Sequence, residues 1–271
     1  MASKLRIGAV SYLNTKPLVY RLDEFAPDAE VTFDLPSRLA DDLASGQLDV
    51  ALIPSIEYFQ QPSYSIISDA CIACRGPVLS VKLLTRVPFA EITTLALDEG
   101  SRTSIALARI LLQERYGSAP ELERLPIGSD AEATSADAVL LIGDRAIHPP
   151  TDAFIDEWDL GDQWYRWSEL SFVFAMWTAR ACVDVSHLSL AFEQARTAGL
   201  ENLEKIAAEE GPKVGLETTE CLSYLKENLY FHLGPRERKG LELFRQHATR
   251  LGMVQEASSV ATSILSMDRA T

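Results

Sequence analysis

The chain has 271 residues, of which 47% are hydrophobic, and it carries a formal net charge of -14. This length accommodates one large domain or two ordinary ones, with enough apolar residues for a substantial core. The acidity repels nucleic-acid phosphates and anionic lipid, and no apolar run reaches the roughly 20 residues that span a bilayer. We therefore expect a globular protein that binds neither nucleic acid nor membrane and holds any anionic ligand by a local arrangement of groups.

The first third of the chain alternates strands and helices. Strands are predicted at 5–10, 31–35 and 49–54, helices at 15–22, 37–46 and 55–59, and β-rich segments at 64–76 and 78–86. In the second helix, Ser37 is the expected N-cap and Gly46 the expected stop. This βαβαβ order is typical of a parallel sheet covered by helices.

The middle of the chain repeats this pattern, and the last third is helical. Strands are predicted at 93–98, 121–127, 136–143 and 171–181, helices at 101–117 and 159–170, and amphipathic helices near 186–210, 217–231 and 235–251. We expect a two-lobed α/β fold, each lobe being a mostly parallel sheet with flanking helices. The first lobe would be discontinuous, comprising 1–85 and 178–271 with the C-terminal helices, the second would comprise 86–177, and a ligand cleft would lie between them.

Four predicted strands end in small or polar residues that begin the next helix. Ser11 and Asn14 follow the first of these strands, Ser55 the second, “EGSRTS” the third, and Gly143 with Asp144 the fourth. In open α/β sheets, ligands bind beyond the carboxyl ends of strands, where helix N-termini present unpaired N–H groups. Several such ends facing one cleft would form an anion site without clustered basic side chains.

Two serine-containing segments are the sharpest candidates for this cleft. In “LDEGSRTS”, Ser101 is a good N-cap, and Thr103 and Ser104 add hydroxyls that capping alone explains less well, so capping and ligand binding both remain open. In “GPVLSVKLLTR”, Ser80 shares a strand face with Lys82 and would face the cleft if this strand is a hinge; a surface serine is the alternative. No GxSxG motif surrounds Ser80, which disfavours an acylated serine.

The remaining motifs indicate structure more than chemistry. Cys71 and Cys74 form a CxxC without a second CxxC or a nearby histidine pair, so reduced structural thiols are favoured over redox chemistry. The four histidines lack metal-ligand spacing, and His148 is expected in an exposed loop. The three tryptophans between 158 and 167 are interpreted as packing residues. There is no GxGxxG motif and no P-loop, so no cofactor is expected.

Seven segments, in order over nearly the whole chain, form a combined signature. They are “RIGAVSYLNTKPL”, “GQLDVALIPSIEY”, “RGPVLSVKLLTRVP”, “LDEGSRTSIALARILL”, “VLLIGDRAI”, “DLGDQWYRWSELSFVFAMW” and “CLSYLKENLYFHLGPRERKGLELF”. Together they resemble the chorismate dehydratases of the futalosine route to menaquinone. The resemblance implies a type II periplasmic-binding-protein fold in a cytoplasmic enzyme that needs no metal or organic cofactor. It implies removal of water from chorismate to give 3-[(1-carboxyvinyl)oxy]benzoate.

The resemblance also implies roles for individual residues. Asn14 of the “YLN” motif and Ser80 of the “GPVxS” motif would be catalytic, and the “SRTS” turn would hold a substrate carboxylate. The expected substrate-binding residues are Ser11, Tyr12, Ser55, Ser101, Arg102, Thr103, Ser104, Gly143 and Asp144. Small departures from the family pattern occur at Glu99-Gly100 and at Glu169 and Ser171, and none removes a proposed catalytic group.

The predicted cleft offers no obvious protein base. We expect the substrate's own side-chain carboxylate to take the proton, while the protein orients the substrate and stabilises developing charge. The predicted partner is therefore a small dicarboxylate, and the oligomeric state is left open.

Three alternative functions remain. A solute-binding protein for a small carboxylate has the same fold but would need a signal peptide, whereas “MASKLRIGAV” leads directly into a strand, which favours the cytoplasm. The sister enzyme 1,4-dihydroxy-6-naphthoate synthase uses a histidine as base, and no histidine here lies in a matching motif. The effector domain of a transcription regulator would need a helix-turn-helix before Leu5.

Overall fold

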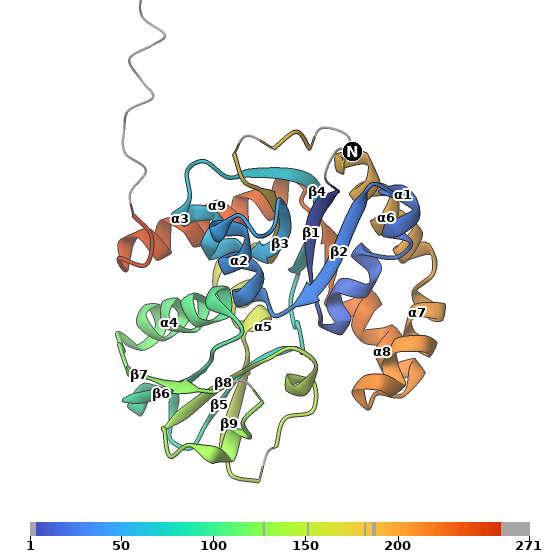
Figure 1. Cartoon of the computed structure of the whole chain (residues 1–271). Coiled ribbons are helices and arrows are strands. Elements are labelled where there is room, and N and C mark those ends of the chain that lie inside the picture. Colours follow the sequence, from blue (N-terminus) through green and yellow to red (C-terminus); the bar gives the residue numbers. More distant parts are fainter. Residues whose placement is uncertain (1–3, 127, 151, 182, 186–187, 256–271) are drawn as a thin grey trace, which may run out of the picture.

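The computed structural model describes residues 4–255 except 127, 151, 182 and 186–187. This part of the chain forms two α/β lobes, each built on one sheet (Figure 1). The first sheet has the order β11-β4-β10-β3-β1-β2, with β1 (Leu5–Val10), β2 (Ala29–Asp34), β3 (Val50–Pro54), β4 (Ser65–Cys74), β10 (Phe172–Ala179) and β11 (Tyr230–His232). The second has the order β7-β6-β8-β5-β9, with β5 (Val81–Thr85), β6 (Thr94–Asp98), β7 (Glu121–Leu125), β8 (Ala138–Ile142) and β9 (Asp156–Asp159).

Both sheets are mixed, whereas the sequence predicted mostly parallel sheets. Strands β2, β1 and β3 run parallel, as do β7, β6 and β8. The strands that complete each sheet pair antiparallel: β10 with β3 and β4, β11 with β4, and β5 with β8 and β9. The direction of these strands could not be read from the sequence because β5 and β10 are buried along their whole length, so they lack the apolar–polar alternation that often marks an antiparallel strand.

The chain crosses between the sheets at residues 75–80 and again at 169–171. Strand β5 belongs to the second sheet and β10 to the first, so the predicted lobe boundary after residue 85 lies at the end of β5, one strand after the first crossing, and the boundary after residue 177 lies inside β10. Burial explains this difference as well, because an apolar strand indicates that it is covered but not in which sheet it lies. The first sheet takes strands from both ends of the chain.

Helices cover the faces of both sheets (Figure 1). They are α1 (Leu22–Phe25), α2 (Pro36–Ser45), α3 (Ser55–Gln60), α4 (Arg102–Tyr116), α5 (Leu160–Ser168), α6 (Leu188–Glu201), α7 (Leu203–Glu210), α8 (Thr218–Ser223) and α9 (Pro235–Arg250). No helix in the described ranges is long and apolar enough to cross a membrane.

Several predicted helices differ in detail. The segment 15–22 is instead a 3-10 helix, Leu13–Leu18, followed by the short α1, and Pro17 within it removes a backbone donor. Helix α2 has Leu35 rather than Ser37 at its N-cap, although Gly46 ends it in a left-handed conformation as predicted. The predicted helix 217–231 breaks after α8 into a π-helical turn, Tyr224–Asn228, and then strand β11, which the sequence analysis missed along with β9.

A buried carboxylate ties both crossings to α9. Glu237, only 1% exposed, accepts hydrogen bonds from Arg75 Nε at 3.0 Å and from Ser171 Oγ at 2.7 Å. Burial raises the pKa of Glu237, but these two hydrogen bonds, a backbone hydrogen bond and the charge of Arg75 together hold the pKa below its ordinary value. Helix α9 also packs closely against the second crossing, since a Cβ at Gly240 would lie 1.9 Å from the Ser171 carbonyl oxygen.

The cysteines and tryptophans singled out in the sequence lie in the core. Cys71 and Cys74 are free and buried in separate apolar clusters, and burial raises the pKa of the Cys74 thiol to about 12. Trp158 stacks on Phe89 with 4.0 Å between ring centroids, and Trp164 is fully buried. These contacts agree with structural roles.

Candidate functional site

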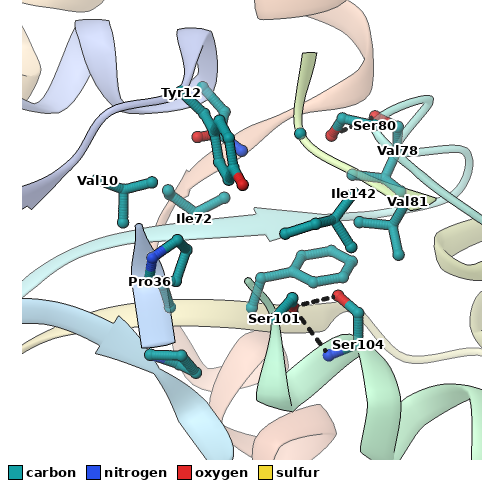
Figure 2. Close-up of a pocket in the computed structure, with 15 residues that line it drawn as sticks. Val10, Tyr12, Pro36, Ile72, Val78, Ser80, Val81, Ser101, Ser104 and Ile142 are labelled. Atoms are coloured by element: carbon teal, nitrogen blue, oxygen red, sulfur yellow. Dashed lines mark hydrogen bonds between the residues drawn. The ribbon is translucent and has the colours of Figure 1, made fainter. Parts of the chain in front are cut away.

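A pocket lies between the two sheets (Figure 2). It is lined by Val10, Tyr12, Asn14, Pro36, Pro54, Ile72, Val78, Ser80, Val81, Ser101, Ser104, Ile142, Gly143, Phe174 and Ala175. The lining includes the carboxyl ends of β1, β3 and β8 and the N-terminus of α4, which is where ligands bind in open α/β sheets. All of these lining residues are uncharged, and few are polar, as is usual for small-molecule pockets.

The structure brings together only part of the predicted site. The pocket is lined by both predicted catalytic residues, Asn14 and Ser80, and by four predicted substrate-binding residues, Tyr12, Ser101, Ser104 and Gly143. The residues predicted to bind substrate that do not line it are Ser11, Ser55, Arg102, Thr103 and Asp144.

Asn14 lies in the 3-10 helix that follows β1, and a residue of the second lobe caps this helix. The Asp144 carboxylate accepts a hydrogen bond from Leu13 N at 3.0 Å. Burial raises the pKa of Asp144. The Asn14 amide oxygen accepts a 3.3 Å hydrogen bond from Thr15 Oγ1, and the Asn14 side chain reaches the pocket. Asp144 therefore positions the segment that carries Asn14 and joins the two lobes.

Ser80 is presented by a strained turn immediately before β5. Ser80 N donates to Val78 O at 2.7 Å, which closes a tight turn around Leu79 with a φ of 59°. Such turns are rare for residues other than glycine, and strain of this kind gathers at functional sites. Ser80 thus precedes the strand that was predicted to contain it.

Asp159, the N-cap of α5, holds this turn in place. Its carboxylate accepts hydrogen bonds from Val78 N at 3.0 Å, from Leu79 N at 2.6 Å and from Asp162 N at 3.1 Å. The pKa of Asp159 is raised by burial, against the effect of these hydrogen bonds. This role of Asp159 was not apparent from the sequence, where the one signal is an aspartate at the start of a predicted helix.

The N-terminus of α4 forms the opposite wall of the pocket. Ser101 is the N-cap: its Oγ accepts from Ser104 N at 3.2 Å and donates to Ser104 Oγ at 2.8 Å (Figure 2). Both hydroxyls line the pocket, so capping and exposure to a ligand occur at the same residues.

The neighbouring residues of the same turn join the lobes instead. Thr103 Oγ1 accepts from Ile56 N at 3.2 Å and lies 3.4 Å from Ser55 Oγ, which itself donates to Val173 O at 2.8 Å. Arg102 pairs with Asp41 at 2.8 Å and with Glu57 at 3.3 Å. These contacts connect α4 of the second lobe to α2 and α3 of the first, and Ser55 in turn connects α3 to β10.

Tyr12 fills the space between two glycines of the second lobe. A Cβ on Gly143 would lie 2.7 Å from the Tyr12 ring, and Gly143 has a φ of 72°; a Cβ on Gly100 would lie 3.2 Å from the Tyr12 hydroxyl. Burial, followed by the negative charge of Asp98, raises the pKa of Tyr12, so its hydroxyl stays protonated near neutral pH. Glycine at both positions allows the lobes to close on this ring.

Two further polar residues near the pocket region have different surroundings. His148 is exposed and pairs with Glu220, outside the pocket lining. Ser11 is exposed at the end of β1, where its N–H donates to Asp34 O at 3.0 Å. Neither arrangement supplies a base to the pocket.

Comparisons with known proteins agree with the resemblance found in the sequence. Residues 5–250 match the family model described as menaquinone biosynthesis. The chain is 31% identical over 260 residues to the chorismate dehydratase of Thermus thermophilus, covering 89% of this chain and 93% of that protein.

Solved structures show the same fold at lower identity. AF1704 from Archaeoglobus fulgidus superposes with a TM-score of 0.75 at 16% identity, covering 93% of this chain and 99% of that one. The periplasmic aliphatic sulphonate binding protein SsuA from Escherichia coli superposes with a TM-score of 0.59 at 14% identity, covering 94% and 95%. The two-lobed periplasmic-binding-protein-like fold is thus confirmed, and the chain belongs to the menaquinone biosynthesis family.

Proposed function

We propose that this protein is a chorismate dehydratase, a hydro-lyase that converts chorismate to 3-[(1-carboxyvinyl)oxy]benzoate for menaquinone biosynthesis. The observation that carries the proposal is the similarity to the Thermus enzyme over nearly the full length of both chains. The pocket supports it, because Asn14 and Ser80, far apart in the sequence, line one cavity between the lobes. A biosynthetic enzyme of this kind would work in the cytoplasm on a small dicarboxylate.

The dehydration needs a proton acceptor and a proton donor. The ring carbon that bears the enolpyruvyl ether loses its hydrogen as a proton, the C–O bond of the neighbouring ring hydroxyl breaks, and that hydroxyl takes up a proton and leaves as water, so that the ring becomes aromatic. The pocket lining contains no carboxylate, histidine or lysine, and the raised pKa of Tyr12 makes it a poor base. The substrate's own side-chain carboxylate is therefore the proposed proton acceptor.

The protein's part is orientation and stabilisation of charge. The N-terminus of α4, with the Ser101 and Ser104 hydroxyls, would hold a substrate carboxylate without a basic side chain. Asn14 and Ser80 would hydrogen-bond the reacting part of the ring. Such pre-positioned donors act most strongly where water is excluded.

Contacts between the lobes favour exclusion of water. Leu13 N donates to Asp144 of the second lobe, and Ser37 N donates to Gly100 O at 3.2 Å. Together with the Arg102 ion pairs, these bonds hold the two lobes around the pocket.

The decisive experiment is incubation of the purified protein with chorismate. We expect a product lighter by one water with benzoate-like absorbance, and absence of that product would overturn the proposal. Recovery of tightly bound, unchanged chorismate would instead support a solute-binding protein. Ser80→Ala and Asn14→Asp should lower turnover, whereas His148→Ala should retain it; an inactive His148→Ala variant would contradict the substrate-assisted mechanism.

A further inference from the structure

Tyr224 has a buried hydroxyl that the proposed mechanism does not use. Its side chain is 1% exposed, and its hydroxyl oxygen has no hydrogen-bond partner among the described residues. An unpaired buried hydroxyl destabilises a fold, so its presence calls for an explanation outside packing. The sequence pattern did not reveal it, because a tyrosine on an apolar helical face looks like a core residue.

The surroundings of this hydroxyl connect it to the pocket. The Ser80 and Asn14 side chains face the phenol, and both favour its ionised form; burial has the larger effect and raises the pKa of Tyr224. The phenol therefore remains a neutral hydrogen-bond donor near neutral pH. Among the described residues, Ser80 Oγ makes one hydrogen bond, a long one of 3.4 Å to Val78 O, so Ser80 is itself poorly satisfied.

The backbone around Tyr224 is also fastened to the segment that carries Ser80. Tyr224 begins a π-helical turn, Tyr224–Asn228, a feature that occurs frequently at functional sites. Asn228 Nδ2, at the end of this turn, donates to Pro77 O at 3.0 Å. The turn thus holds the phenol against the crossing at 75–80.

We propose that Tyr224 is a positioning residue: once substrate is bound, its hydroxyl donates to Ser80 Oγ and directs the Ser80 proton toward the departing hydroxyl of the substrate. This inference rests on the proposed dehydration of chorismate. A chain of two hydroxyls polarises each member, so Ser80 becomes a better donor where negative charge develops. Tyr224 does not line the pocket, and its effect reaches the substrate through Ser80.

The test compares Tyr224→Phe with the wild-type enzyme in chorismate turnover and thermal unfolding. We expect kcat to fall at least tenfold, KM to stay within twofold, and Tm to stay equal or rise, because the unpaired hydroxyl is gone. Combining Tyr224→Phe with Ser80→Ala should cost no more than Ser80→Ala alone. The matched control is Thr249→Val, which removes another buried, unpartnered hydroxyl, in α9 outside the pocket lining, and should leave kcat unchanged.

Three results would overturn the inference. The first is full kcat in Tyr224→Phe, with or without a lower Tm. The second is a double variant in which the fall in kcat caused by Tyr224→Phe multiplies with the fall caused by Ser80→Ala. The third is an equal fall in kcat for Thr249→Val. Failure of the wild-type protein to convert chorismate would instead refute the proposed function itself, so the two failures are distinguishable.

Discussion

The polar groups that hold the lobes together differ from those at the pocket in how completely they are paired. At the crossings, Glu237 accepts hydrogen bonds from Arg75 and Ser171. At the pocket, Ser80 Oγ makes one long hydrogen bond of 3.4 Å and the Tyr224 hydroxyl makes none among the described residues. An unpaired buried polar group costs roughly 1–3 kcal/mol. In these two regions, complete pairing accompanies a structural role, whereas incomplete pairing leaves the Ser80 hydroxyl available to a ligand.

Ser80→Ala tests this difference between the two regions with the largest expected effect. The hydroxyl is expected to stabilise charge in the transition state, so its removal should lower kcat by about 10²–10³-fold. Its one long hydrogen bond contributes little to the fold, and Tm should stay within a few degrees of the wild type. Steady-state turnover and a thermal melt check both statements. An active Ser80→Ala variant with a much lower Tm would show that the Ser80 hydroxyl stabilises the fold and does not act on the substrate.

Arg75→Ala should show the opposite behaviour. This substitution leaves Ser171 as the remaining side-chain partner of the buried Glu237 carboxylate. It should lower the free energy of unfolding by about 2 kcal/mol. This loss is smaller than for a fully buried ion pair because the Arg75 side chain is 41% exposed. Since Arg75 does not line the pocket, kcat should change less than twofold. Denaturant unfolding at neutral pH measures the loss.

The pH dependence sharpens this second prediction. The pKa of Glu237 in the folded wild-type protein lies below its ordinary value. The ionised Glu237 carboxylate therefore stabilises the fold fully at pH values above that ordinary pKa, and this contribution is lost as the pH falls through the lowered pKa. The stability difference between wild type and Arg75→Ala should therefore shrink in acid. A difference that is constant from neutral pH to acid would show that the Glu237–Arg75 charge interaction contributes nothing.

Gly143→Ala tests closure of the lobes on Tyr12. The new methyl would lie 2.7 Å from the ring at a φ of 72°, so we expect kcat/KM to fall about tenfold as the closed state becomes strained. Gly117 is the matched control: it has a φ of 65°, and a Cβ there would meet nothing within 4 Å. Gly117→Ala should lower Tm without lowering kcat/KM. Equal kcat/KM in the two variants would contradict the role of the Tyr12 contact.

The sequence predicted most strands, the two-lobed fold and the residues on both sides of the pocket, because these depend on local pattern and on where strands end. Strand direction and the crossing points were not predictable, since β5 and β10 are buried along their whole length. The roles of Asp159 and Tyr224 depend on partners dozens of residues away, as in the hydrogen bonds from Val78 and Leu79 to Asp159. No local motif around Asp159 or Tyr224 reveals these distant partners.

Thr103→Val separates two interpretations of one hydroxyl and carries the smallest expected effect. The sequence predicted that Thr103 binds a substrate carboxylate, whereas the structure pairs it with Ile56 N and Ser55 between the lobes, 1% exposed. If pairing is its role, the isosteric variant should lose about 1 kcal/mol of stability, measured by denaturant unfolding, with KM unchanged. Ser104→Ala, at the pocket, should instead raise KM with little loss of stability, because Ser101 remains the cap. A raised KM in Thr103→Val would show that the Thr103 hydroxyl contacts the substrate. Thr103 and Ser104, neighbours in the same helical turn, would then both bind the ligand, and the difference proposed between them would be wrong.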